Sequence, residues 1–78
     1  MLQKGSYVRL VSAPNTRKGT IADVVIGDDG KAQFKFHHDE RFKDTLPDFY
    51  RPEHDFEECD RPSDGEVELI NKLIEHGS

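Results

Sequence analysis

Histidine, cysteine and carboxylate side chains are the residues of this chain best suited to bind a metal ion. His37, His38 and Asp39 are adjacent, and His54 and Cys59 follow further along the chain. Neighbouring residues of a strand point to opposite faces of a sheet, so His37 and His38 are poorly placed to bind one ion together. No HxxxH or CxxC spacing sets two ligands on one element. The sequence therefore predicts no metal site and no cofactor.

Cys59 and His54 also form the one pair suited to act as nucleophile and base. They are five residues apart, and no neighbouring segment supplies an obvious pair of oxyanion donors. Adjacent carboxylates such as Glu57 and Glu58 diverge on a strand, and neither a P-loop nor a GxGxxG motif occurs. We therefore predict no catalytic residues and no small-molecule substrate, with Cys59 as a small core residue.

Basic side chains are concentrated in the first half of the chain. Residues 1–36 carry a formal charge of +3 and residues 37–78 carry −8, within a net charge of −5. Phosphate affinity depends on Lys and Arg side chains that displace condensed counterions, so only the first half is suited to nucleic acid. The acidic second half instead favours a basic protein partner. We predict that contacts with DNA or RNA use the basic edge made by Arg9, Arg17, Lys18, Lys31 and Lys35.

Seven aromatic residues are many for so small a protein. Phe34 and Phe36 alternate with polar residues and are expected in the core, together with Phe56. The other aromatic side chains, including Phe42, either pack at the edges of this core or line a surface groove. Aromatic rings are enriched at protein interfaces, so we predict a protein-binding surface. Its residues are Tyr7, Phe49 and Tyr50.

Alternating β-branched and aromatic residues predict five short strands, which must position the side chains above. We expect these strands at residues 7–11, 20–26, 31–37, 48–50 and 56–59. Imperfect alternation in the second strand indicates a bend or a bulge. Residues 27–30 predict a hairpin turn, residues 38–47 a loop, and residues 51–55 a single turn.

One helix is expected after the strands. Ser63 and Glu66 form a capping box, and Gly77 is placed as the C-cap. Between them, apolar side chains recur at helical spacing at Val67, Ile70, Leu73 and Ile74. The polar face of the helix is acidic, which favours packing on the strands or on a neighbouring domain over membrane binding.

The predicted fold class is mainly β: a small SH3-like barrel of about five short antiparallel strands plus one C-terminal helix. At 78 residues the chain suffices for one small domain. We place the barrel at residues 1–60, and the linker and helix at residues 61–78.

The cysteine count and the hydropathy pattern indicate the compartment. One cysteine excludes an internal disulfide framework and fits a reducing environment. No stretch approaches the ~20 apolar residues of a membrane span, and the N-terminus lacks the apolar region of a signal peptide. We expect a cytoplasmic protein that makes no membrane contact.

Two segments of the first third resemble the KOW-type and Tudor-like SH3 barrels of transcription and translation factors. They read KGSYVRLV at residues 4–11 and RKGTI at residues 17–21. In those families a glycine-led strand is followed by a basic, glycine-containing turn and a second strand.

A wider resemblance covers almost the whole chain. The order of its segments is similar to the small barrels that begin bacterial Swi/Snf-type helicases, in which an xPExxLE element closes the barrel. Here that element reads RPEHDFE at residues 51–57. The resemblance implies an accessory module of a larger nucleic-acid-dependent ATPase, contacting DNA, RNA or a partner protein while the motor lies elsewhere. The alternative is a stand-alone protein-interaction adaptor.

Overall fold

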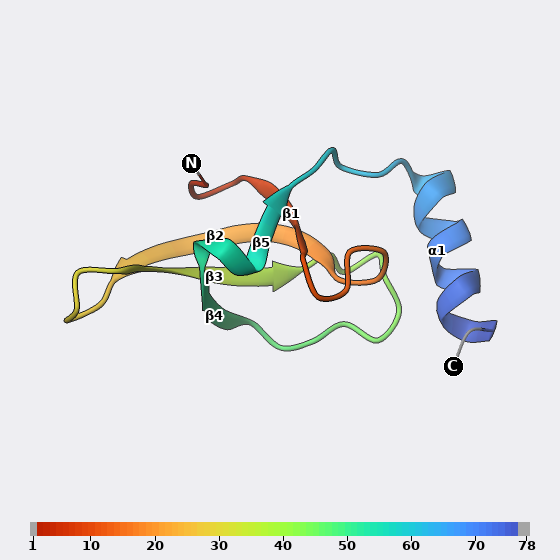
Figure 1. Cartoon of the computed structure of the whole chain (residues 1–78). Helices are drawn as coiled ribbons and strands as arrows, with labels where there is room; N and C mark the ends of the chain where they lie inside the picture. The colour runs from red at the N-terminus through yellow and green to blue at the C-terminus, as the bar shows by residue number, and fades with distance from the viewer. Residues whose placement is uncertain (1, 77–78) are drawn as a thin grey trace.

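Five strands, one 3₁₀ turn and one helix follow one another in the computed structural model, which describes residues 2–76 (Figure 1). The predicted mainly β fold class, with five antiparallel strands and one C-terminal helix, is confirmed. The elements are β1 (Tyr7–Leu10), β2 (Lys18–Ile26), β3 (Ala32–His38), β4 (Phe49–Pro52), η1 (Glu53–Asp55), β5 (Phe56–Glu58) and α1 (Asp64–His76).

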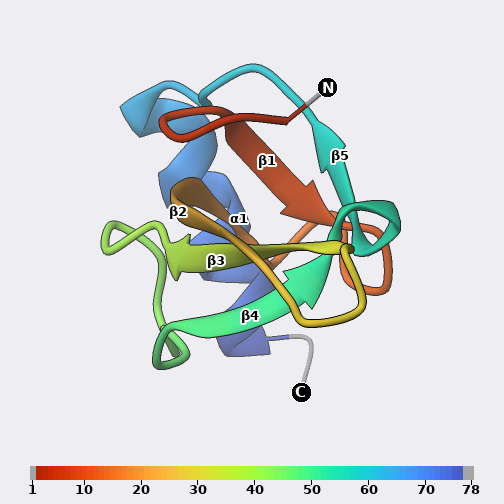
Figure 2. The same ribbon diagram turned by 90° about the vertical axis from the view of Figure 1, so that its left-hand side faces the viewer.

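All five strands belong to one antiparallel sheet in the order β4-β3-β2-β1-β5. The long strand β2 pairs with both β1 and β3, and its register with β3 shifts between Ile21 and Asp23. This irregularity confirms the bulge predicted from the imperfect alternation, and bulges increase the local twist of a sheet. Viewed along the molecule, β1 and β5 cross the direction of β3 and β4 (Figure 2).

Phe36 lies at the centre of the core and joins the two edges of the sheet. Its ring stacks on Phe56 with centroids 5.8 Å apart and tilts against Phe49 at 5.3 Å. Phe49 belongs to β4 and Phe56 to β5, the two edge strands, so the sheet curls until both edges touch one ring. A barrel-like sheet around one core is the result. The other buried core residues are Leu2, Val8, Leu10, Ile21 and Phe34.

Two glycines explain local features of the sheet. Gly19 lies on β2 against β3, where a Cβ atom would overlap the carbonyl oxygen of His37 and lie 2.9 Å from the Cα of His38. Gly30 adopts a φ of +80° in the β2–β3 turn, as expected for the predicted hairpin. The Gly27 amide closes this hairpin by donating to the Lys31 carbonyl at 2.9 Å.

Strand β3 is shifted by one residue from the predicted range of 31–37 and ends at His38. We had placed His38 in the following loop because it is polar, but its side chain is only 2% exposed. It lies edge-on to the rings of Phe36 and Phe42, each with centroids 5.8 Å away. The aromatic neighbours therefore extend the buried face of β3 beyond the apolar run visible in the sequence.

The segment before β5 also differs from its prediction. The sequence indicated a single turn over residues 51–55, whereas Arg51 and Pro52 complete β4 and the 3₁₀ turn η1 takes only Glu53–Asp55. Arg51 pairs with Phe34 of β3, which accounts for its extended conformation. The backbone amide of Leu2 donates to a carboxylate oxygen of Glu53 at 3.0 Å, so the N-terminal arm is tied to η1.

Helix α1 begins as the capping box predicts. The Ser63 hydroxyl accepts a hydrogen bond from the Glu66 amide at 3.3 Å, and the Val67 amide donates to the Ser63 carbonyl at 2.9 Å. Gly77, the predicted C-cap, lies outside the described residues. Among residues 2–76 no helix has the length and apolar character needed to cross a lipid bilayer.

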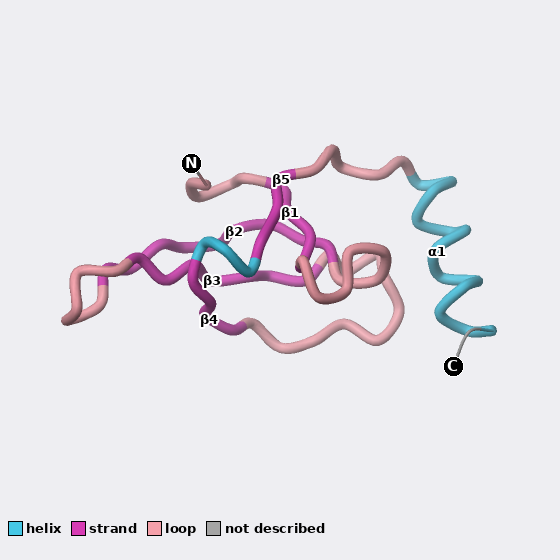
Figure 3. Tube along the Cα trace, viewed as in Figure 1, coloured by secondary structure: helices cyan, strands magenta, loops and turns pink. Residues whose placement is uncertain are grey.

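The helix packs on the loop between β3 and β4. The Asn71 side chain accepts a hydrogen bond from the Lys43 amide at 2.9 Å and donates to the Arg41 carbonyl at 3.0 Å. An ion pair between Lys43 and Glu75 lies beside these bonds. In the secondary-structure view the loop passes along one side of the helix, which stands at one end of the molecule (Figure 3).

Candidate functional site

Two of the five predicted nucleic-acid-binding residues meet on the outer face of the sheet. Arg9 and Lys18 are directly opposite each other in the β1–β2 register. Their neighbours Val8 and Leu10 point into the core, so Arg9 faces away from it. Arg9 is paired with Glu57 of β5 at 3.1 Å, and hydrogen bonding to Glu57 raises the pKa of the guanidinium. A carboxylate thus neutralises much of the positive charge at this position.

The other three predicted cations are dispersed. Arg17 donates to the carbonyl oxygen of Asp44 at 2.5 Å, and Lys35 lies 3.9 Å from a carboxylate oxygen of Asp48. Lys31 is exposed in the β2–β3 turn, which forms the end of the molecule opposite α1 (Figure 1). The predicted basic edge is therefore divided between the Arg9–Lys18 pair and three separate positions.

Tyr7, a predicted protein-contacting residue, is only 8% exposed. Its hydroxyl donates to Asp39 at 2.8 Å, and burial together with this hydrogen bond raises the pKa of the phenol. The guanidinium of Arg61 covers the other side of the ring at 4.8 Å from its centroid. Little of the Tyr7 side chain is left for a partner to contact.

Asp39 and Arg41 join this tyrosine to the linker before the helix. Burial by itself raises the pKa of Asp39, but hydrogen bonds from Arg41 and Tyr7 outweigh it and hold this pKa far below its usual range. Arg41 donates to Asp39 at 2.8 Å, to the Pro62 carbonyl at 3.1 Å and to Asp64 at 3.1 Å. The network holds the start of α1 against the sheet, which is a structural role.

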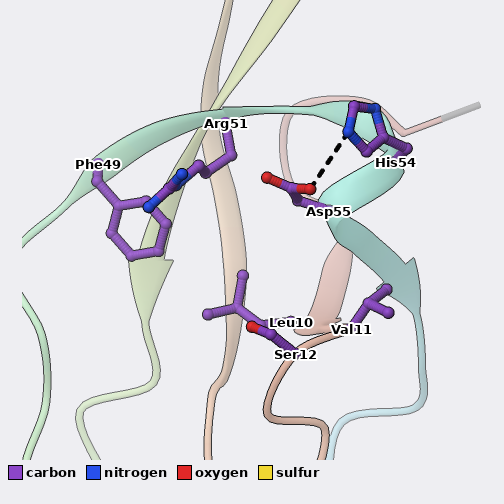
Figure 4. Close-up of a pocket in the computed structure, with 7 residues that line it drawn as sticks. All are labelled: Leu10, Val11, Ser12, Phe49, Arg51, His54 and Asp55. Carbon is purple, nitrogen blue, oxygen red and sulfur yellow. Dashed lines mark ion pairs between the residues drawn. The ribbon is translucent and has the colours of Figure 1, made fainter.

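An open groove on the barrel lies between the end of β1, the start of the β1–β2 loop, β4 and η1 (Figure 4). Its volume is about 510 Å³. The Val11 amide donates to the Asp55 carbonyl at 3.0 Å, which holds the two walls of the groove together. Seven residues line it: Leu10, Val11, Ser12, Phe49, Arg51, His54 and Asp55.

The groove combines an apolar floor with one free cation. Leu10 and Phe49 reach it from the core, and the Val11 side chain is 54% exposed. The Arg51 guanidinium lies over the Phe49 ring, 5.6 Å from its centroid, and points away from Asp55 (Figure 4). Within residues 2–76 no carboxylate oxygen comes within 4.0 Å of it. The groove can therefore take an apolar group beside an anion.

Of the predicted protein-contacting residues, only Phe49 belongs to this groove. Tyr50 is 45% exposed, but it is opposite Lys35 in the β3–β4 register and therefore on the outer face. Sequence reasoning missed Val11 and Arg51 as groove residues. The one signal for them was position, because Val11 ends the predicted strand of residues 7–11 and Arg51 begins the predicted turn of residues 51–55.

Cys59 lacks the environment of a nucleophile. Burial raises the pKa of its thiol, although nearby Lys18 and Arg9 act in the opposite direction. A raised thiol pKa disfavours the thiolate that nucleophilic catalysis requires. In the part of the chain that the structure describes, no three His, Cys, Asp or Glu side chains are grouped so as to hold a metal ion.

Comparisons with protein-family models, with curated proteins and with solved structures found no match to this chain. The SH3-like, KOW and Tudor-type resemblance therefore stays a prediction from the residue pattern. The groove and the arrangement of its side chains are what the structure contributes to the question of function.

Proposed function

We propose that this chain is a non-catalytic, SH3-like binding module of the cytoplasm that contacts a partner protein through the groove between β1, β4 and η1. The observation that carries the proposal is an open groove of about 510 Å³ that is lined by the apolar side chains of Leu10, Val11 and Phe49. Binding sites are typically concave, largely apolar and marked by a few polar groups that fix orientation.

Two residues that line the groove, Leu10 and Phe49, are paired with neighbouring strands of the sheet. Leu10 is paired in register with Phe56 of β5, and Phe49 with Phe36 of β3. Preorganised side chains lose little conformational entropy when a partner binds, so the groove is suited to hold an extended segment.

The distribution of charge favours a protein over nucleic acid as the partner in this groove. The chain has a net charge of −5, and nucleic-acid affinity depends on many unpaired cations. Arg9 and Lys35 each lie beside a carboxylate. The groove itself contributes one free guanidinium, which is too few for a phosphate backbone.

Selection from a peptide library tests the protein-binding function. Random peptides about a dozen residues long are displayed on phage and selected against the full chain, with Val11→Glu as the counter-selected variant. We expect enriched sequences that bind the parent chain and lose binding to Val11→Glu, since a charge there blocks the apolar floor. Enrichment of nothing, or of peptides that bind both proteins equally, would contradict the proposal.

DNA or RNA is a second candidate partner because Arg9 and Lys18 are directly opposite in register and Lys18 follows Arg17 in the chain. Fluorescence anisotropy with short duplex and single-stranded DNA at about 50 mM salt gives non-specific contacts their best conditions. The double variant Arg17→Ser with Lys18→Ser should weaken binding while the fold stays intact. Absence of binding to the parent chain at this salt excludes this candidate.

Membership in a larger nucleic-acid-dependent ATPase is supported by the resemblance of residues 51–57 to the xPExxLE element. In the structure this segment forms the end of β4, η1 and the start of β5, which pairs with β1. The full reading frame of the gene tests the assignment. A helicase core encoded in the same frame supports it, and a stop codon directly after Ser78 favours the adaptor.

A further inference from the structure

The groove proposed to bind a partner protein contains one charged side chain that has no ion-pair partner among residues 2–76. The Arg51 guanidinium lies over the Phe49 ring, 5.6 Å from its centroid, and the attraction of a cation to an aromatic face does not use its N–H donors. These donors form a fork that matches a carboxylate in a bidentate pair. Arg51 is therefore suited to bind a carboxylate.

The remaining charges of the groove do not compete for this position. Asp55 is the only carboxylate among the lining residues, and it lies 3.4 Å from the Nε2 atom of His54 (Figure 4). The Arg51 side chain extends in the opposite direction, over the ring of Phe49. Arg51 thus marks one end of the groove, and the His54–Asp55 pair lies toward the other.

The apolar part of the groove defines the second feature of a ligand. Leu10 lies below Arg51, and Val11 lies below the His54–Asp55 pair (Figure 4). The exposed Val11 and the half-buried Phe49, at opposite sides of the groove, each gain from an aliphatic side chain that removes their surface from water. A ligand with a carboxylate next to an aliphatic group satisfies both parts at once.

We propose that the groove recognises an extended segment of a partner protein in which an Asp or Glu residue and an aliphatic residue two positions away point to the same face, with Arg51 binding the carboxylate. This inference rests on the proposed function of the groove and specifies its ligand. The carboxylate comes from a side chain and not from a chain terminus. Terminal carboxylates are captured by free backbone amides, whereas the Val11 amide is already bonded to Asp55.

The specified ligand differs from the partner expected from sequence. The charge of −8 on residues 37–78 favours a basic partner, yet the groove presents an unneutralised arginine from that same half. Local charge governs a contact of this size, because exposed charges more than about 8–10 Å away are largely screened at physiological salt.

The test uses three blocked heptapeptides, Ac-Gly-Leu-Gly-X-Gly-Leu-Gly-NH₂ with X as Glu, Gln or Lys, because residues two apart in an extended chain share a face. They are titrated into the ¹⁵N-labelled full chain at neutral pH, and affinities are taken from amide chemical shifts. A leucine on each side of X makes the result independent of strand direction. We expect the Glu peptide to shift the amides of Val11, Ser12 and Asp55 and to bind about fivefold more tightly than the Gln peptide, since a charged hydrogen bond exceeds a neutral one by ~1 kcal/mol. The Lys peptide should bind more weakly than both.

Arg51→Gln is the decisive variant. It should reduce the preference for Glu over Gln to about onefold while leaving binding of the Gln peptide nearly unchanged, because the apolar floor is retained. Arg61→Gln is the matched control: Arg61 also stacks on an aromatic ring, that of Tyr7, but it does not line the groove. This control should keep the preference. Amide dispersion of each variant checks that the sheet is folded.

The outcomes separate the two proposals. Groove shifts with equal affinity for the three peptides overturn the acidic ligand and leave the protein-binding groove standing. A preference for Glu that survives Arg51→Gln also overturns the role of Arg51. No shift of groove amides with any of the peptides, and no Val11-dependent sequence from the phage library, overturns both proposals.

Discussion

Asp39 joins Tyr7 of the sheet to Arg41 and thereby to the linker before α1. It accepts hydrogen bonds from the Tyr7 hydroxyl, from the Arg41 backbone amide and from the Arg41 guanidinium. These donors hold the pKa of Asp39 far below its usual range. A carboxylate with so many donors is stable only in its ionised form, because the protonated acid accepts fewer of these bonds.

Asp39→Asn should lower the free energy of unfolding at neutral pH by about 1–3 kcal/mol, the range for hydrogen bonds to a charged group. The folded-state pKa is depressed, so the stabilisation is present above the unfolded-state pKa of about 3.9 and is lost as the pH falls toward the folded-state value. Urea unfolding at a series of pH values checks this. The two proteins should differ most above about pH 5 and converge in acid; a constant difference would contradict the assignment.

Tyr7 and Tyr50 differ in exposure, although the sequence led to the same prediction for both. Tyr7 and Tyr50 were both predicted to contact a partner. Tyr7 is covered by Asp39 and Arg61, whereas Tyr50 stays exposed on the outer face. The covering residues of Tyr7 come from positions 32 or more residues away, and no pattern around Tyr7 indicates them.

At the scale of elements, β2 is the strand on which the sheet is built. It is nine residues long, pairs with strands on both sides and contains the bulge near Ile21. Its first residues lie against β1 while its last residues form the hairpin with β3 alone. The close approach at Gly19 makes this double pairing compatible with the curl of the sheet.

Gly19→Ala should be strongly destabilising, by roughly 3 kcal/mol or more, because the new methyl group overlaps backbone atoms that cannot move without breaking the β2–β3 pairing. Thermal unfolding followed by circular dichroism measures the effect. Gly65→Ala is the matched control: its Cβ atom meets nothing closer than 4.0 Å, at the Ser63 hydroxyl. Alanine is a better helix former, so this control should raise stability by up to about 1 kcal/mol. Equal melting temperatures for the two variants would refute the close-approach argument.

At the scale of the whole molecule, the helix is separate from the main core. The main buried cluster draws on the strands and the N-terminal arm, and α1 contributes nothing to it. The molecule is elongated, 42 × 22 × 17 Å, with α1 at one end and the β2–β3 turn at the other (Figure 1). The helix is held through Asn71, Arg41 and the buried Val67, so barrel and helix can respond differently to mutation.

Asn71→Ala should release the helix from the β3–β4 loop without unfolding the sheet. It removes both hydrogen bonds that join α1 to Lys43 and Arg41, and lone short helices are marginal in water. Amide hydrogen exchange should show roughly tenfold faster exchange in α1, equivalent to ~1.4 kcal/mol, and little change in β2 and β3. Lys72→Ala, which affects only a surface pair with Glu68, is the control. Equal loss of protection in sheet and helix would show one cooperative unit.

Folding also changes the charge pattern of the chain. The basic and acidic halves are separate in sequence, yet Arg9 pairs with Glu57 and Lys35 lies near Asp48. Two of the five residues of the predicted nucleic-acid edge, Arg9 and Lys35, therefore lie beside carboxylates of the acidic half. Arg51, the unpaired arginine of the groove, belongs to residues 37–78, which carry the formal charge of −8.

The sequence by itself determined the elements of this protein: five strands, the β2–β3 hairpin, the bulge of β2 and the capped helix. These features depend on residues close together in the chain, whose alternation and turn chemistry act locally. Only the tertiary structure decided that His38 and Tyr7 are buried and that Arg51 stacks on Phe49 above a groove. In the groove the Val11 amide is hydrogen-bonded to the Asp55 carbonyl, and the Tyr7 hydroxyl is hydrogen-bonded to Asp39, 32 residues further along the chain. Such contacts depend on how far the sheet curls, which is a property of the whole packed core.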